Sequence, residues 1–216
     1  MRTKLIVMAR HQLLREGLAA LLGSRSDIEL LAEAADGQEG VRMTARLMPQ
    51  VVLMEMQMPG LHGVDAAQRI LATSSDSQII CLAAEEPSWM LRRALEAGVR
   101  GILGKNCGLE ELLRAITAVT NRQLYLSPLL ADAAIAACID RPGRAAATGV
   151  FVLLTSKERE IVQLLAEGLS TKEAALHLGL SYKTVAAHRE HASAKLGARG
   201  IADITRYAIR EGLVVP

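Results

Sequence analysis

The chain has 216 residues and half of them are hydrophobic, so it can form one large or two small domains and is too apolar for wholesale disorder. Aromatic residues make up only 2%, which excludes a stacking platform for single-stranded nucleic acid and predicts an aliphatic core. The formal net charge is +2, there is no signal-peptide cleavage pattern, and no apolar run approaches the roughly 18 residues of a membrane helix. We therefore expect a cytoplasmic protein with no membrane partner. Its cysteines, Cys81, Cys107 and Cys138, follow no metal-ligand spacing and are expected to be reduced thiols.

Short apolar runs alternate with helical patterns over roughly the first 125 residues. The expected strands are Lys4–Ala9, Ile28–Glu33, Val51–Met56, Gln78–Ala84 and Val99–Leu103. The expected helices are Leu13–Leu22, Gln38–Leu47, Val64–Ala72, Ser88–Ala97 and Leu109–Thr120. This alternation predicts an α/β domain with a doubly wound, five-stranded parallel sheet. In such sheets functional residues gather at the carboxyl ends of the strands.

A change of pattern follows this domain. Ser127–Asp140 is predicted to be one more helix, with Pro128 in its first turn. The next residues, Arg141–Gly149, are small or are Pro and Gly, as is typical of a linker. We therefore expect a first domain over residues 1–126, a linker helix and flexible linker over 127–149, and a small all-α domain over 150–216.

Four helices are expected in the last part of the chain. The first begins at a capping box formed by Thr155 and Glu158. A short second helix covers Thr171–Leu178, a third covers about Tyr182–Leu196, and a fourth covers roughly Ile201–Glu211. A short helix, a tight turn that contains glycine and a longer helix form the helix-turn-helix arrangement.

The third of these helices has two different faces. Val185, His188, Ala192 and Leu196 are expected to pack inward, with His188 equally suited to packing or to a phosphate contact. The opposite face would reach base edges in a major groove, where alanines allow close approach and Glu190 can accept a hydrogen bond from cytosine. Nearby lysines and threonines are suited to phosphates. The candidate DNA-binding residues are Thr171, Lys172, Lys183, Thr184, Ala187, His188, Glu190, His191 and Lys195.

The electrostatic signal for DNA binding is modest. The whole formal charge excess lies from Gly149 onward, where nine Lys and Arg stand against seven Asp and Glu. So small an excess predicts weak binding by one copy, and we expect a homodimer on paired half-sites of double-stranded DNA.

At this point the motifs identify a family. Leu154–Gly197, which contains LTSKERE, LLAEGLSTKEAA, LSYKTVAAHR and KLG, closely resembles the helix-turn-helix of NarL/FixJ-type (LuxR-type) transcription factors. The earlier part, with LLREGLAALL, PQVVLMEMQMPG and ALEAGVRGIL, resembles a response-regulator receiver domain. The resemblance covers nearly the whole chain outside the linker. It implies a two-domain bacterial transcription regulator whose last helix often forms the dimer contact on DNA.

The receiver resemblance also shows departures. A receiver of this family takes a phosphoryl group on an Asp at the end of its third strand, beside an acidic pair that holds Mg²⁺. Here Glu55 stands at the acceptor position, and Ala9 and Arg10 stand at the acidic pair. Ala83 replaces the hydroxyl residue that meets the phosphoryl group, while Lys105 is kept.

These replacements, with Ile102 at the position of the switch aromatic, predict a pseudo-receiver that accepts no phosphoryl group and binds no Mg²⁺. We expect Glu55 to pair with Lys105, with Arg10 or with both, so that the Arg10 guanidinium fills the space of the metal. Two hypotheses follow. Either Glu55 imitates a phosphorylated Asp and holds the domain in one state, or the domain is a degenerate scaffold kept for dimerisation.

The sequence thus predicts a dimeric, sequence-specific transcription regulator that works without phosphorylation and needs no cofactor. Another regulator or RNA polymerase are further candidate partners. The alternative is a regulator gated by a small molecule or a partner protein bound to the pseudo-receiver. An enzyme is not expected, because the strand ends offer one carboxylate, no nucleophile–base pair and no Gly-rich phosphate loop. His62 is expected to be exposed to solvent.

Overall fold

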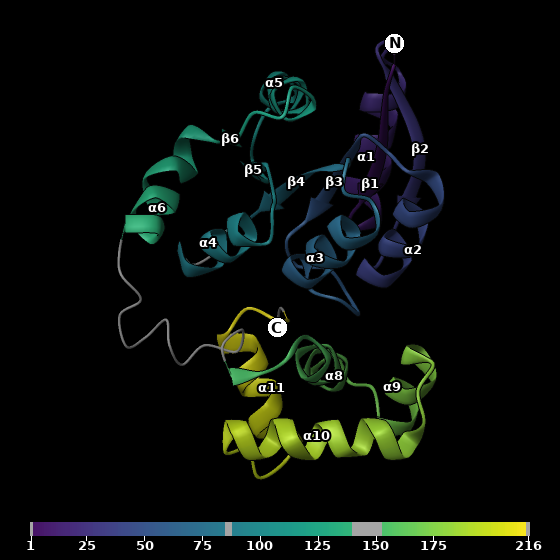
Figure 1. Ribbon diagram of the computed structural model, residues 1–216, viewed down its shortest axis with the longest axis vertical. Coiled ribbons are helices and arrows are strands. Elements are labelled where there is room, and N and C mark those ends of the chain that lie inside the picture. The colour runs from purple at the N-terminus through teal and green to yellow at the C-terminus, as the bar shows by residue number, and fades with distance from the viewer. Residues whose placement is uncertain (1, 85–87, 140–152, 215–216) are drawn as a thin grey trace. The chain divides into compact units, whose positions relative to one another are not determined.

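The computed structural model describes residues 2–84, 88–139 and 153–214 (Figure 1). The chain separates into two compact units, Met1–Asp140 and Arg141–Pro216. The linker expected over 141–149, and with it the predicted start of the last domain at residue 150, lies outside the described residues.

The first unit contains one parallel sheet in the order β2-β1-β3-β4-β5-β6. Its strands are β1 (Thr3–Met8), β2 (Ile28–Ala34), β3 (Val51–Glu55), β4 (Gln78–Ala83), β5 (Gly101–Gly104) and β6 (Tyr125–Leu126). The expected fold class is confirmed, but the prediction of five strands is wrong. The sixth strand, β6, pairs with β5 through Gly101 and Tyr125 and has two residues, which is too short to leave a periodic pattern in the sequence.

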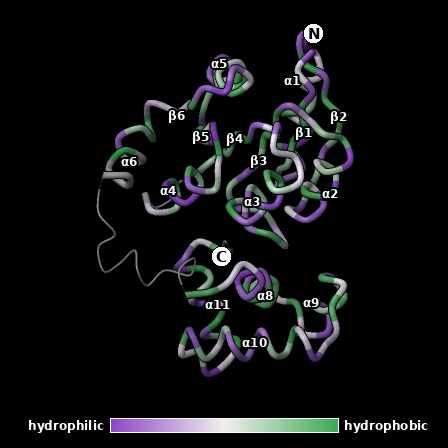
Figure 2. The backbone as a smooth tube through the Cα atoms, viewed as in Figure 1, coloured by the Kyte–Doolittle hydropathy of each residue, from purple (hydrophilic) through white to green (hydrophobic). Residues whose placement is uncertain are grey.

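Helices cover both faces of this sheet (Figure 1). They are α1 (Gln12–Gly23), α2 (Gly37–Leu47), α3 (Gly63–Thr73), α4 (Ser88–Glu96), α5 (Leu109–Thr120) and α6 (Pro128–Ile139). Helices α1 and α5 pack on one face, where Leu22 and Ile116 meet Leu53 of β3 in one core cluster. Helices α2, α3 and α4 lie on the other face. Every residue of β3 is buried as a result, and Figure 2 shows hydrophobic residues along the central strands.

Helix α6 begins at Pro128, directly after the buried Ser127, as its first-turn proline predicts. The sequence pattern predicts this helix as part of the linker. It instead packs against α4 and β5, and so belongs to the first unit.

The second unit is all-helical, as expected. Its helices are α8 (Ser156–Ala166), α9 (Thr171–Leu178), α10 (Tyr182–Leu196) and α11 (Ile201–Arg210). Capping boxes at Thr155 with Glu158 and at Ser170 with Glu173 fix the starts of α8 and α9. Gly197, at φ 64°, ends α10 in the left-handed conformation that glycine adopts readily.

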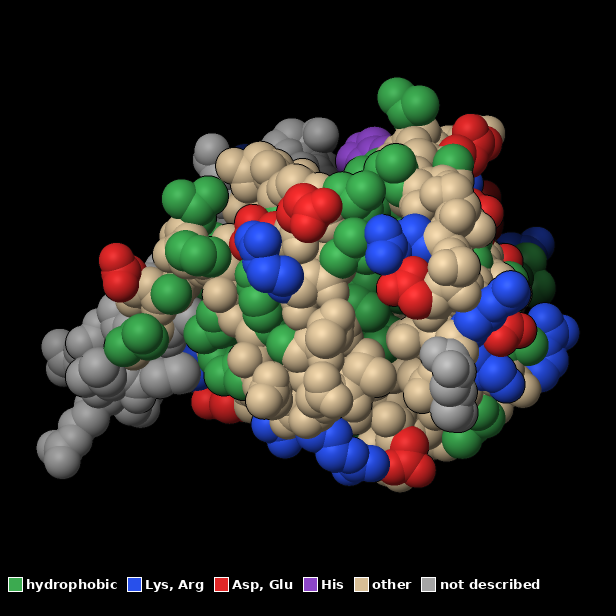
Figure 3. Space-filling view, turned by 90° about the horizontal axis from the view of Figure 1, so that it is seen from above, with side chains coloured by type: hydrophobic (Ala, Val, Ile, Leu, Met, Phe, Trp, Pro, Cys, Tyr) green, Lys and Arg blue, Asp and Glu red, His purple; other side chains and the backbone are tan. Residues whose placement is uncertain are grey.

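The two edges of the sheet differ in length and charge. On one edge, β2 exposes Glu29 and Glu33, whereas the other edge is the two-residue strand β6. Acidic and basic side chains are interspersed on the face of the molecule drawn in Figure 3, with hydrophobic side chains between them. In the described part of the chain, no helix is both long and apolar enough to cross a bilayer.

Candidate functional site

The first candidate site lies where the strands of the sheet end. Glu55 is the last residue of β3, and its side chain is completely buried. Its Oε1 lies 2.6 Å from Lys105 Nζ, just beyond the end of β5. Its Oε2 accepts a hydrogen bond of 2.5 Å from the main-chain N–H of Arg10, just beyond β1. The structure therefore joins three strand ends through one carboxylate.

The contact with Arg10 differs from the expectation. Arg10 is exposed, and it binds Glu55 through its main chain, so the prediction that its guanidinium fills the metal space is wrong. His11, which directly precedes α1, places Nδ1 3.7 Å from Oε1 of Glu55 but is itself largely exposed. Lys105 is therefore the close cation in this pocket, although Oε1 makes no directed hydrogen bond to a described residue.

A buried carboxylate is costly unless charged or polar donors offset its lost hydration. For Glu55 the ammonium of Lys105 and the N–H of Arg10 offset that loss. The neighbouring positions Ala9 and Ala83 are fully buried and carry no side-chain oxygen. A hard divalent cation prefers several oxygen ligands, and the described residues contain no group of three or more His, Cys, Asp or Glu placed to hold a metal. These residues therefore do not fit Mg²⁺.

The loop after β3 is fixed by its backbone. Gly63 N donates a 2.9 Å hydrogen bond to Met56 O, and a Cβ at Gly63 would lie 2.5 Å from that oxygen, so only glycine fits there. His62 is buried rather than exposed, because its Nδ1 accepts from Val64 N at 3.2 Å and caps α3. The sequence prediction for His62 is wrong because the Gly63–Met56 backbone hydrogen bond holds this loop close to the end of β3, where the imidazole caps the first turn of α3.

The second candidate site is the exposed face of α10. Val185 and Ala192 are fully buried, and His188 is half-buried beside them. The predicted outward residues are all exposed, namely Lys183, Ala187, Glu190, His191 and Ala194. The 3.6-residue period thus gives α10 one packed face and one exposed face.

Two of the predicted flanking contacts are already engaged inside the unit. Thr171 is only 7% exposed, and its hydroxyl accepts from Arg189 Nη1 at 3.0 Å, so its expected phosphate contact stays a prediction that depends on the remaining O–H donor. The Thr184 hydroxyl shares a 2.8 Å hydrogen bond with Ser181, which caps α10. Lys172 is exposed and makes no ion pair with a described residue.

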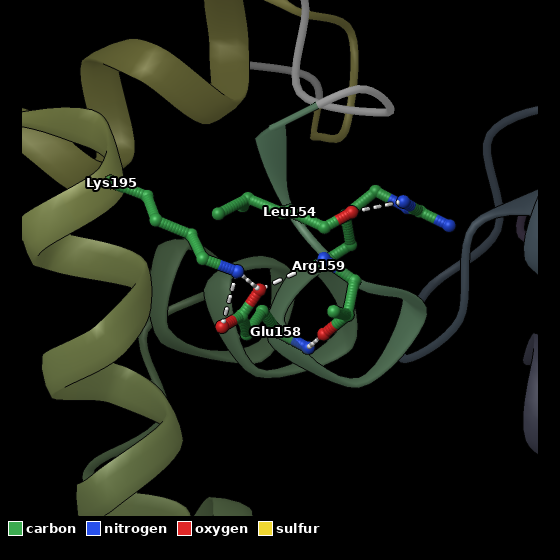
Figure 4. A network of polar contacts seen from close by, with 5 residues as sticks. Leu154, Glu158, Arg159 and Lys195 are labelled. Carbon is green, nitrogen blue, oxygen red and sulfur yellow. Dashed lines mark hydrogen bonds and ion pairs between the residues drawn. The ribbon is translucent and has the colours of Figure 1, made fainter.

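Lys195 is engaged in a different way. It reaches from α10 to Glu158 at the start of α8, with Nζ 2.9 Å from Oε1 and 2.6 Å from Oε2 (Figure 4). Burial alone would raise the pKa of Glu158, but the hydrogen bonds from Lys195 and Thr155 outweigh it and hold that pKa below its ordinary value. The predicted phosphate contact by Lys195 must therefore compete with this ion pair.

Sequence reasoning missed Arg189. The spacing in the sequence could have drawn attention to it, because Arg189 follows Tyr182 by seven residues, which places both on one flank of α10. With Thr171 and Lys172 they line one groove of about 320 Å³.

Comparison with known proteins agrees with this architecture. The family model of the response regulator receiver domain matches residues 5–117, and that of the luxR family of bacterial regulatory proteins matches residues 152–208. The oxygen regulatory protein NreC of Staphylococcus aureus (strain JH9) is 31% identical over 214 residues, which are 98% of this chain and 99% of that protein.

Solved structures give the same result. A two-component response regulator of the LuxR family from Aurantimonas sp. SI85-9A1 is 26% identical with a TM-score of 0.60, over 65% of this chain and 100% of that one. RcsB from Salmonella enterica serovar Typhimurium, bound to a promoter, has a TM-score of 0.61 over 96% of this chain and 98% of that one. RcsB is 20% identical, so this match shows likeness of fold.

Proposed function

Because the chain belongs to the response regulators that carry a LuxR-type DNA-binding domain, we propose that it is a dimeric, sequence-specific transcription regulator that acts without phosphorylation. The single observation that carries the claim of phosphorylation independence is the buried Glu55 carboxylate, which lies against the ammonium of Lys105 and the main-chain N–H of Arg10. We assign DNA recognition to α10. In this proposal the sheet unit mediates dimer formation and does not accept a phosphoryl group.

The DNA-binding half rests on the surface of α10. Its free face presents Ala187, Glu190 and His191 to base edges, with Lys183 beside them for phosphates. The RcsB structure is of a protein bound to a promoter, and its fold is the one found here. Dimer formation, which the small charge excess leads us to expect, is part of the proposal, as are contacts with another regulator or RNA polymerase.

The phosphorylation-independent half rests on charge and geometry. In-line phosphoryl transfer needs a free carboxylate and a metal that neutralises the phosphoryl oxygens. The Glu55 carboxylate is held on both oxygens, and Ala9 and Ala83 supply no further ligand. Phosphoryl donors therefore have no free acceptor at this edge of the sheet.

The test is a titration of the purified chain with acetyl phosphate or beryllium fluoride in the presence of Mg²⁺. We expect no change in DNA affinity, measured by fluorescence anisotropy, and no change in oligomeric state, measured by light scattering. A shift in either quantity would overturn phosphorylation independence and would instead support ordinary receiver chemistry or gating by a ligand.

Two variants separate the remaining hypotheses about Glu55. If its carboxylate imitates a phosphorylated Asp, Glu55→Gln weakens both self-association and promoter binding, although the side chain keeps its size. If the unit is only a scaffold, a folded Glu55→Gln protein binds like the parent chain.

The face of α10 is tested by a pair of variants on a panel of duplexes. Glu190→Ala is expected to change base preference, whereas Lys183→Ala is expected to weaken binding to all sequences and to lower the salt slope by about 0.9. The matched control is Arg25→Ala, a charge removal in the sheet unit from an exposed pair with Asp27. Identical behaviour of the two α10 variants would contradict the assignment of the faces.

A further inference from the structure

The flank of α10 holds a cation whose position is fixed and whose hydrogen-bonding capacity is largely free. Arg189 is half-buried, and its Nη1 donates to the Thr171 hydroxyl at 3.0 Å. Among the residues that the structure describes, no carboxylate pairs with Arg189. An arginine has five N–H donors in a rigid fork, so one hydrogen bond orients the group and leaves most donors available.

The anchor for this arginine is itself rigid. Thr171 is the first residue of α9 and is 7% exposed. The Thr171–Arg189 hydrogen bond therefore joins α9 to α10 and limits the positions that the guanidinium can take. A preorganised cation loses less conformational entropy on binding an anion than a free surface side chain does.

The surroundings of Arg189 suit a phosphate. Lys172 and Tyr182 line the same groove of about 320 Å³ and are exposed, and Ile201 lines its far side. The groove therefore offers a guanidinium, an ammonium and a phenol hydroxyl and, among its described lining residues, no carboxylate. Such a set of donors is complementary to a phosphate monoanion.

The position of the groove indicates which phosphate. It lies on the flank of α10 about a quarter turn beyond Glu190, which is the nearer edge of the exposed face, and Ala187 stands farther round the helix. When a helix lies in a major groove, its flanks face the sugar–phosphate strands while its central face meets the bases.

We propose that Arg189, held by Thr171 and assisted by Lys172 and Tyr182, binds one backbone phosphate of duplex DNA and sets the depth of α10 in the groove. This proposal rests on the DNA-binding function proposed above. It adds Arg189 to the phosphate contacts that the sequence predicts for Thr171 and Lys172.

The test compares three variants in the full chain on one duplex at several salt concentrations. Arg189→Gln removes one phosphate contact, so the salt slope is expected to fall by about 0.9 and the affinity by about fivefold at physiological salt, equally for all sequences. Thr171→Val keeps every charge and removes only the anchor, so the affinity should fall while the salt slope stays. Arg25→Ala, the remote control, should change neither. Circular dichroism establishes that each variant is folded.

A second readout locates the contact on the DNA. We compare duplexes in which one phosphate at a time is replaced by a neutral methylphosphonate. The affinity of the parent chain should fall when the replacement is at one particular position in each half-site. The affinity of Arg189→Gln should not change with the replacement at that position. Inorganic phosphate at millimolar concentration should not compete, because the groove recognises a phosphate that α10 has already positioned.

The outcomes separate the two proposals. If the parent chain binds no duplex, DNA binding itself is wrong. If the parent chain binds DNA and folded Arg189→Gln keeps its affinity and salt slope, only the role of Arg189 is overturned. If Thr171→Val binds like the parent chain, the anchor is overturned. Competition by inorganic phosphate would contradict a site that needs the duplex.

Discussion

Each unit of this chain places a buried glutamate against a lysine, and the two pairs do different work. In the sheet unit, Glu55 and Lys105 join the ends of β3 and β5 at the edge where the family carries out its chemistry. In the helical unit, Glu158 and Lys195 join α8 to α10 and support the helix that we assign to DNA. The first pair lies in the pocket that we propose accepts no phosphoryl group, and the second supports the surface that we propose binds DNA, so the same two side chains differ in role with their place in the fold.

The degree of burial also separates the pairs. Glu55 is fully buried and Lys105 is 28% exposed, whereas Lys195 is 41% exposed. The Glu55–Lys105 pair is therefore less accessible to water than the Glu158–Lys195 pair. Removal of its lysine is expected to lower the free energy of unfolding by more. The following predictions test that difference, from the largest expected effect to the smallest.

Lys105→Met is expected to have the largest effect. The substitution leaves the buried Glu55 carboxylate without its cation, and the expected loss is about 3–5 kcal/mol in the free energy of unfolding of the sheet unit. Urea unfolding followed by the fluorescence of Trp89, the single tryptophan, reports on this unit. The double variant Glu55→Met, Lys105→Met removes both charges and should recover most of the loss. A double variant as unstable as the single one would show that the pair is not the cause.

Glu158→Ala is expected to have the next largest effect. It removes a capping box and the ion pair with Lys195, for a loss of about 1–2 kcal/mol in the helical unit, the pair adding little because Lys195 is partly exposed. Glu173→Ala is the matched control, because Glu173 completes a similar capping box on α9 and has no ion pair to a described lysine. We expect it to cost slightly less, by the small contribution of the ion pair, as measured by thermal unfolding with circular dichroism. Equal losses would mean that the Lys195 pair contributes nothing.

The same carboxylate predicts a dependence on pH. The pKa of Glu158 in the folded chain lies below its ordinary value of 4.5, so the native state favours the ionised form. The stabilisation is complete above the ordinary pKa and is lost as the pH falls through the lower folded value. The midpoint temperature of thermal unfolding should therefore decrease between pH 7 and pH 3 in the parent chain, and this decrease should be smaller in Glu158→Gln. Parallel decreases would contradict this assignment.

His11→Ala is expected to have the smallest effect. The imidazole lies 3.7 Å from Glu55 and is 64% exposed, so its contribution is screened by water. We expect a change within about 0.5 kcal/mol in the urea unfolding of the sheet unit. A larger loss would show that His11, and not only Lys105 and the Arg10 amide, holds the carboxylate.

Much of the fold could be predicted from the sequence because long elements repeat a pattern many times. The parallel sheet, the capping box at Thr155 and the two faces of α10 all follow from apolar spacing and end signals. Strand β6 could not be predicted, since Tyr125 and Leu126 are too few for a period. The place of α6 depends on its contacts with α4, which no local pattern contains.

The sites were predictable at the level of residues but less so at the level of atoms. The spacing of strand ends indicates that Glu55, Lys105 and the Arg10 region meet, yet the choice between a guanidinium and a main-chain N–H depends on the turn after β1. Lys195 lies 37 residues from Glu158, so no sequence period links them. The burial of Thr171 likewise depends on the angle between two helices rather than on either helix alone.

The edges of the sheet have a consequence for assembly. A strand of another chain can extend a sheet only along an edge that is long, flat and uncharged. Here β2 offers the negative charges of Glu29 and Glu33, and β6 offers only two residues. Edge-to-edge pairing of sheets from two copies is therefore disfavoured at both edges, and the proposed dimer is expected to form through helical surfaces instead.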